Sequence, residues 1–143
     1  MGITLDVTID DSDLTMALAA APDHVRVKGW KIVRENSFAV ERQIKLDMPV
    51  RYGRARASWG HWQADLIVDR DKAKDANPAD AVWKEEPVKL QLTQGTNVDY
   101  VRDLNDGSSQ QRPAGFVDDA AEKWAARMGE ELVELVRDEL DKG

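Results

Sequence analysis

Two long segments in which apolar residues recur every three or four positions constrain the fold more than any other feature of the sequence. Residues 23–47 place one broad, mostly apolar stripe on a helical wheel: Val25, Gly29, Val33, Asn36, Val40, Gln43 and Ile44. A C-terminal helix of roughly 25 residues, about 37 Å long, carries the second stripe. That stripe consists of Val117, Ala121, Trp124, Met128, Leu132, Leu135 or Val136, and Leu140. Each helix must bury its stripe against another element of the fold.

Short alternating segments supply the strands. Residues 3–9 alternate between apolar and polar side chains, which is the period of a half-buried strand. Residues 59–68 are predicted to form a second strand. Residues 81–93 are predicted to form a third in two pieces, because Pro87 favours an edge or a bulge. We expect the last two segments to pair as a hairpin over about residues 59–93, with the charged stretch 69–80 as its tip.

These elements predict an α+β fold: a small antiparallel β-sheet with a long N-terminal helix and a C-terminal amphipathic helix. The acidic run before Leu14 offers N-caps for a short helix over residues 14–21, and residues 98–104 are expected to form another short helical segment. With 143 residues and no internal repeat, the chain is expected to form a single domain over residues 1–143.

The composition excludes several classes of function. The chain has no cysteine, which rules out disulfides, thiolate zinc sites and cysteine nucleophiles, and it has only two histidines. Its net charge of -7 argues against general coating of nucleic acid, which needs surplus lysine and arginine. No apolar run has the length of a membrane span, and the N-terminus lacks the order of a signal peptide. We therefore expect a soluble protein made in the cytoplasm, with no membrane contact.

One short loop gathers arginines and aromatic residues despite the acidic balance of the chain. The stretch MPVRYGRARASWGHW, residues 48–62, contains Arg51, Arg54, Arg56 and His61. Arg56 and His61 stand at the R-x4-H spacing of some helical ribonucleases, in which the two side chains activate a ribose hydroxyl and steady the phosphate. This cluster supports an alternative function, a nucleic-acid-binding protein or ribonuclease. The glycine and tryptophans around His61 favour instead the start of a strand.

The face of the 23–47 helix opposite its apolar stripe is unusual, because it mixes aromatic and basic side chains. Trp30, Arg34, Phe38, Arg42 and Lys45 follow one another there at helical spacing. Two explanations stay open. The rings pack on a neighbouring element of the same chain, or they form a contact between subunits, where aromatic residues and arginine are enriched.

No arrangement of residues in the sequence predicts an active site. The aspartates of residues 65–75 lack the order of a calcium loop and alternate with lysines. Adjacent carboxylates such as Glu85 and Glu86 point in different directions on a strand or helix, so they do not form an acid–base pair. The serines lack nucleophile-elbow glycines, and the glycines are too sparse for a phosphate loop. We therefore expect no catalytic residue, no metal ligand and no cofactor.

Two stretches together resemble one protein family. MPVRYGRARAS resembles the P-V-x-T-G-x-L-R-x-S element of the small neck proteins of long-tailed phages, the head–tail joining or tail-completion family of the lambda tail-completion protein Z. NVDYVRDLNDGSSQQRPAGFVDDAAEKW resembles that family's later element, which leads through Gly-x-Ser and Pro-x-Gly into the C-terminal helix. The matching residues are Pro49, Val50, Gly53, Arg54, Arg56 and Ser58, then Tyr100, Leu104, Asn105, Gly107, Ser109, Gln111, Pro113, Gly115 and Phe116. Tyr52 and Ala55 depart from the family's usual Thr and Leu.

The resemblance implies a structural virion protein without catalytic residues, a subunit of a ring at the junction of phage head and tail. The implied partners are further copies in a hexameric or similar ring, adjacent neck, tail-terminator or tail-tube proteins, head-completion or portal-side proteins, and genomic DNA in the lumen. The implied location is the virion, after assembly in the cytoplasm of the host bacterium. We expect the subunit contacts to draw on Trp30, Arg34, Phe38, Arg51, Gly53, Arg54, Arg56, Tyr100, Asn105, Gly107, Gln111, Pro113, Gly115 and Phe116.

Overall fold

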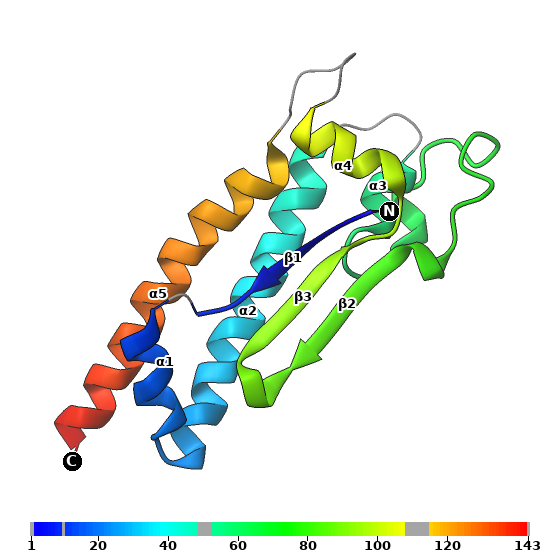
Figure 1. Cartoon of the computed structure of the whole chain (residues 1–143). Helices are drawn as coiled ribbons and strands as arrows, with labels where there is room; N and C mark the ends of the chain where they lie inside the picture. Colours follow the sequence, from blue (N-terminus) through cyan, green and yellow to red (C-terminus); the bar gives the residue numbers. More distant parts are fainter. Residues whose placement is uncertain (1, 10, 49–52, 108–114, 143) are drawn as a thin grey trace.

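The predicted α+β fold is confirmed in a computed structural model that describes residues 2–9, 11–48, 53–107 and 115–142 (Figure 1). The helices are α1 (Ser12–Ala19), α2 (Asp23–Asp47), α3 (Arg54–Ser58), α4 (Asp99–Asp106) and α5 (Phe116–Lys142). The strands are β1 (Ile3–Val7), β2 (Ala81–Glu86) and β3 (Gln91–Thr96). Both long helices form where the periodicity predicts them, and α2 has the predicted bounds.

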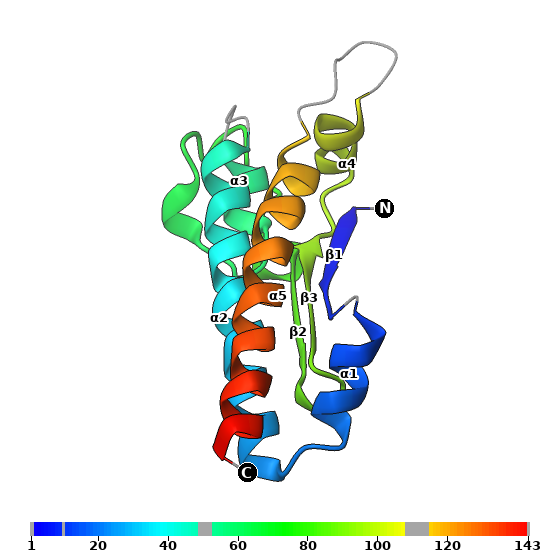
Figure 2. The ribbon, with the colours of Figure 1, turned by 90° about the vertical axis from the view of Figure 1, so that its left-hand side faces the viewer.

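The strands form one antiparallel sheet in the order β1-β3-β2. Figure 2 shows this sheet nearly edge-on, with α2 and α5 packed together on one side of it. Leu92, Gln94 and Thr96 of β3 are buried beneath the helices, while Thr93 between them faces outward. The molecule therefore has two layers, a pair of long helices and a three-stranded sheet.

The apolar stripe of α2 faces the hydrophobic core. Its core positions divide between two hydrophobic clusters, one at each end of the helix pair. The cluster around Ile44 joins the end of α2 to α3, α4 and the start of α5, whereas the cluster around Val33 joins α2 to α1 and the later turns of α5. Asp11 caps α1 by accepting a hydrogen bond from the Leu14 N–H at 3.1 Å. The short helix thus begins at the acidic run, as expected.

The strand predicted over residues 59–68 is wrong. Trp59 directly follows α3 and is fully buried, Gly60 has a left-handed backbone with φ of +65°, and a 3-10 turn follows at Ala64–Leu66. Val68, the last apolar residue of that segment, is 71% exposed. The alternating pattern fails here because the tryptophan takes its place in the core directly after a helix, and the backbone then turns away from the sheet.

The hairpin predicted over residues 59–93 is wrong as well. The observed hairpin is formed by β2 and β3, which are joined by a 3-10 turn over Pro87–Lys89 and by Leu90 with φ of +52°. Pro87 begins the turn, as its fixed φ and missing N–H favour. The other partner of β3 is β1, from the opposite end of the chain. Residues 69–80 form a loop, as predicted, but this loop leads into β2 and is not a hairpin tip.

Two glycines in regular elements give opposite predictions for the free energy of unfolding. A Cβ on Gly29 in α2 would meet Leu18 Cδ2 at 3.5 Å, which is ordinary contact, so Gly29→Ala should raise stability by about 0.5–1 kcal/mol. A Cβ on Gly95 in the central strand would lie 2.3 Å from the Ile3 carbonyl oxygen. Gly95→Ala should therefore lower stability by at least ~1–3 kcal/mol.

Urea unfolding followed by circular dichroism measures both changes. Gly129→Ala on α5 is the matched control, since a Cβ there meets nothing within 4 Å and should give the helical gain alone. Equal midpoints for Gly95→Ala and the unmodified chain would contradict the strand pairing described here.

Candidate functional site

The first family-like element is built around Gly53 and Arg56 at the C-terminal end of α2. Gly53 has φ of +87°, and a Cβ there would lie 2.2 Å from the Leu66 carbonyl oxygen, so only glycine fits without rearrangement. The Arg56 guanidinium donates to the carbonyl oxygens of Met48 at 3.0 Å and Leu46 at 2.9 Å. These carbonyls lie at the end of α2, where they lack helical donors and a positive charge is favourable.

Arg54 is also engaged within the chain. Its Nε and one terminal nitrogen donate to the two carboxylate oxygens of Asp80, at 3.2 and 3.4 Å. Asp80 is buried and also accepts from the backbone N–H of Asn77, so the pair ties α3 to the loop that precedes β2. Such a two-point contact between guanidinium and carboxylate fixes the orientation of both groups. Arg51, the third arginine of the predicted cluster, lies outside the described residues.

Behind this element runs a buried chain of polar contacts that the sequence interpretation missed. The Trp59 indole N–H donates to Gln94 Oε1 at 2.8 Å, and Gln94 Nε2 donates to the Ser37 carbonyl at 2.8 Å. Ser58 Oγ lies 2.8 Å from Thr96 Oγ1. One signal in the sequence could have indicated these contacts. Gln94 and Thr96 lie on the same side of the strand as Leu92, and a buried polar side chain needs a hydrogen-bond partner.

The second family-like element is organised by Asn105, whose side chain is 1% exposed. Its Oδ1 accepts from the Val117 N–H at 2.9 Å, and its Nδ2 donates to Asp118 at 3.1 Å, while its carbonyl accepts from the Gly115 N–H at 3.1 Å. Asn105 thus binds the first turn of α5 to the last turn of α4. Gly107 and Gly115 both have positive φ, 84° and 64°, which lets the backbone leave α4 and enter α5.

The two elements meet at one end of the molecule. The end of α2, α3, α4 and the start of α5 lie together there (Figure 1), and one hydrophobic cluster contains residues from both elements, including Ala55 and the fully buried Phe116. Tyr100 of α4 lies near Arg54. Burial raises the pKa of the Tyr100 hydroxyl, and the nearby Arg54 charge opposes that rise. Tyr100 is 44% exposed, so part of its ring is open at this end.

Several expected subunit contacts therefore serve the fold of the chain itself. Gly53, Asn105 and Phe116 are buried and offer no side-chain surface to a second subunit, which corrects the expectation for these three. Arg54 and Arg56 have partners within the chain, and Gly107 and Gly115 shape the backbone. Among the described residues of the two elements, Tyr100 is the one large hydrophobic side chain that is exposed. Gln111 and Pro113 lie outside the described residues.

The aromatic face of α2 packs on neighbouring elements, which supports the first of its two explanations. The Phe38 ring stacks on His61 with centroids 5.5 Å apart and lies 4.9 Å from Trp83 of β2. Arg34 forms an ion pair with Glu85 of β2 at 2.5 Å. Trp30 is half-buried against the second hydrophobic cluster. Phe38 and Arg34 nevertheless remain partly open beside β2, so a contact with another subunit is compatible with this packing.

Arg56 and His61, the pair at ribonuclease-like spacing, have separate partners in the structure. His61 contacts Glu41 through its backbone N–H at 2.5 Å and its Nδ1 at 2.9 Å, and its ring lies 4.1 Å from Trp83. Arg56 is directed to the end of α2. Each side chain thus has a separate role in the fold, and no shared phosphate site is formed by these contacts.

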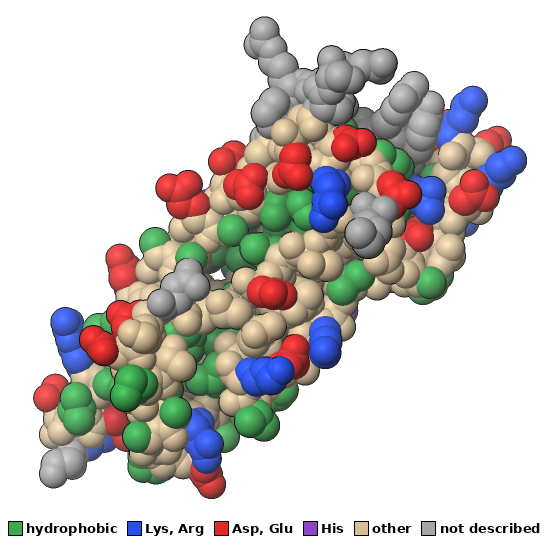
Figure 3. Space-filling view, in the orientation of Figure 1, with side chains coloured by type: hydrophobic (Ala, Val, Ile, Leu, Met, Phe, Trp, Pro, Cys, Tyr) green, Lys and Arg blue, Asp and Glu red, His purple; other side chains and the backbone are tan. Residues whose placement is uncertain are grey.

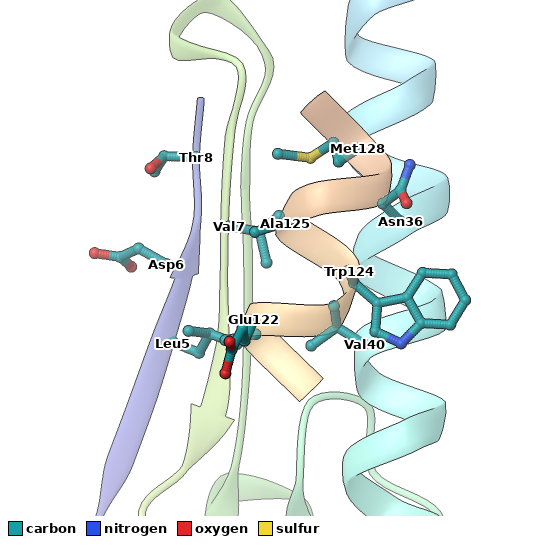
Figure 4. Close-up of a pocket in the computed structure, with 11 residues that line it drawn as sticks. Leu5, Asp6, Val7, Thr8, Asn36, Val40, Glu122, Trp124, Ala125 and Met128 are labelled. Atoms are coloured by element: carbon teal, nitrogen blue, oxygen red, sulfur yellow. The ribbon is translucent and has the colours of Figure 1, made fainter. Parts of the chain in front are cut away.

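A groove opens between β1 and α5, with a volume of about 310 Å³. In Figure 3 it is a hollow lined by hydrophobic side chains with acidic side chains on either side. Figure 4 shows Leu5 and Val7 of β1 on one wall and Met128 of α5 opposite, with Glu122 at the side. The Trp124 indole N–H in the same wall is buried and has no hydrogen-bond acceptor among the described residues. The sequence gives no warning of this groove, because it depends on how far the sheet covers the helices.

The role of Arg56 gives a prediction that separates folding from nucleic-acid binding. Arg56→Ala leaves two carbonyls without their charged donor and should lower the free energy of unfolding by about 1–2 kcal/mol. Arg42→Ala is the control, because Arg42 is exposed on the same helix and should change stability by less than ~0.5 kcal/mol. Denaturant unfolding measures both variants. Unchanged stability of Arg56→Ala with loss of salt-dependent RNA binding would instead support the ribonuclease alternative.

Among the described residues, no group of three or more histidine or acidic side chains is placed to hold a metal ion. No helix in those residues combines the length and the apolar composition needed to cross a lipid bilayer. The chain matches no protein-family model, no curated protein and no solved structure.

Proposed function

We propose that the chain is a structural protein of a phage virion, a subunit of a ring at the head–tail junction that completes the tail or neck and connects it to the capsid. The observation that carries the proposal is the convergence of the two family-like elements. They are separated by the whole of β2 and β3 in sequence, yet they share one hydrophobic cluster at one end of the molecule. A resemblance spread over two distant segments is more meaningful when those segments build one structural unit.

The roles of the matched residues support a structural function over a chemical one. The guanidinium groups of Arg54 and Arg56 bind a carboxylate and two helix-terminal carbonyls, and Asn105 binds backbone and carboxylate groups. These contacts make a rigid end with the half-exposed Tyr100 on its surface. Rigid elements that present a few exposed aromatic residues are suited to protein–protein contacts.

The partners that follow from this proposal are other copies of the chain and the proteins of adjacent layers. These are neck, tail-terminator or tail-tube proteins on one side and head-completion or portal-side proteins on the other, with the genome in the lumen. The subunit would be made in the bacterial cytoplasm and function in the virion. The acidic chain carries 27 acidic and 20 basic side chains, so carboxylates are plentiful for contacts with basic residues of its neighbours.

Deleting the gene from its phage tests this proposal. We expect filled heads and separate tails in electron micrographs, and loss of infectivity, because the joining ring is missing. Supplying the unmodified chain from a plasmid should restore joined particles. Tyr100→Ala should restore them poorly, while Lys31→Ala, at an exposed site on α2, should restore them fully.

The folded state of both variants is checked by circular dichroism, so that a failure to restore particles is not confused with unfolding. Complete infectious particles from the deletion strain would overturn the proposal.

A further inference from the structure

Within the described parts of the chain, both edges of the sheet are strands with no further strand beside them. The order β1-β3-β2 places β1 at one edge and β2 at the other. An edge strand presents unpaired N–H and C=O groups, which another strand can pair with. In Figure 1 these edges face opposite sides of the molecule, one toward α5 and one away from it.

The β1 edge adjoins the groove and is acidic. Because the sheet has only three strands, it leaves part of α5 uncovered beside β1, and the groove lies in that place. Asp6 of β1 points away from the helices, and Glu122 of α5 stands across the groove (Figure 4). A fourth strand next to β1 would extend the sheet over this uncovered part of α5.

The β2 edge carries charges of both signs, because Lys84, Glu85 and Glu86 follow one another in the strand and Lys84 Nζ lies 3.6 Å from Glu86 Oε1. Lys84, on the outer face of β2, is 70% exposed. Arg34 of α2, with a side chain 45% exposed, lies beside β2 through its ion pair with Glu85. Phe38 and Trp83 form the apolar part of this side. One side of the molecule thus combines an open strand with Asp6 and a groove. The other combines an open strand of mixed charge, in which Lys84 pairs with Glu86, with Arg34 and aromatic residues.

We propose that copies of this chain associate side by side, with β1 of one copy pairing with β2 of the next in a continuous sheet. Both strands run antiparallel to β3, so in copies of equal orientation they pair in parallel. Asp6 and Lys84 are both opposite Thr93 of β3, and side-by-side placement without a shift sets Asp6 directly beside Lys84 of the next copy. Opposite charges at such cross-strand positions favour the pairing.

The two symmetric alternatives would join β1 to β1 or β2 to β2 about a dyad, which pairs identical patches and by itself gives a dimer. Pairing β1 with β2 joins different patches, which is a heterologous contact of the kind that closes rings. The inference rests on the proposed function in one respect only, that a ring is the expected assembly.

Charge reversal provides the first test, with self-association measured by sedimentation at increasing concentration. Asp6→Lys and Lys84→Asp should each weaken association about tenfold, since an attractive pair becomes a repulsive one. The double variant should recover the affinity of the unmodified chain. Lys31→Asp, a reversal on an exposed part of α2, is the matched control and should leave association unchanged within about twofold.

Engineered cysteines provide the second test, because the natural chain has none. Within one chain, positions 6 and 84 lie on either side of β3. Their separation is roughly 9–10 Å, twice the strand spacing, which is too far for a disulfide. Between paired copies they would be about 4.8 Å apart, within disulfide range. Mild oxidation of the double variant Asp6→Cys/Lys84→Cys should give a ladder of covalent oligomers on non-reducing gels. The control Asp6→Cys/Lys31→Cys should give no ladder.

Three results would overturn the inference: a chain that stays monomeric at millimolar concentration, association that no charge reversal changes, or association without a disulfide ladder. Each is distinguishable from failure of the proposed function. A chain that forms rings through another surface would still join heads to tails, and an edge-paired oligomer from a phage that does not need this gene would refute the function alone.

Discussion

The hydrogen bond from the buried Trp59 indole to Gln94 is the contact on which the arrangement of the other elements depends. Gln94 of β3 also donates a hydrogen bond to the Ser37 carbonyl of α2. Its side chain therefore links β3 both to α2 and to the residue that follows α3. In a buried site, an amide or indole left unpaired costs about 1–3 kcal/mol, so sliding β3 along α2 by one residue is strongly disfavoured. The register of β3 then fixes β1 and β2, because both pair with it.

The features that the sequence predicted are those encoded locally. The stripes of α2 and α5 repeat over many turns, and such long periodic patterns are difficult to satisfy with another structure. The segment after α3 failed because its pattern was ambiguous: a buried Trp59 fits both the start of a strand and the end of a helix. The left-handed Gly60 that decides between them follows from tertiary contacts. Pairing of β1 with β3 could not be predicted, because it joins segments from distant parts of the chain whose alternation fits several partners.

The candidate site was also predicted only in part from the sequence. The resemblance proposed from the sequence drew attention to residues that build one end of the molecule, namely Gly53, Arg56 and Asn105, but it did not distinguish residues that support the fold from residues that contact a partner. The exposure of each side chain separates the two kinds of residue. Gly53, Arg56 and Asn105 hold the backbone in place, whereas Tyr100 is exposed at the surface of this end of the molecule. Motifs in a small protein therefore reflect the requirements of its fold at least as much as those of its partners.

Contact surfaces are better sought where the fold leaves its own interactions incomplete. A sheet of three strands over two long helices leaves an open edge on each side and a groove where a fourth strand would lie. Open edges are a hazard in a soluble chain, because any exposed strand could pair with them. Short strands of five and six residues limit the strength of such unintended pairing. Asp6 on one edge and Lys84 on the other share the register of Thr93, so the pairing that we propose between unlike edges would place opposite charges side by side.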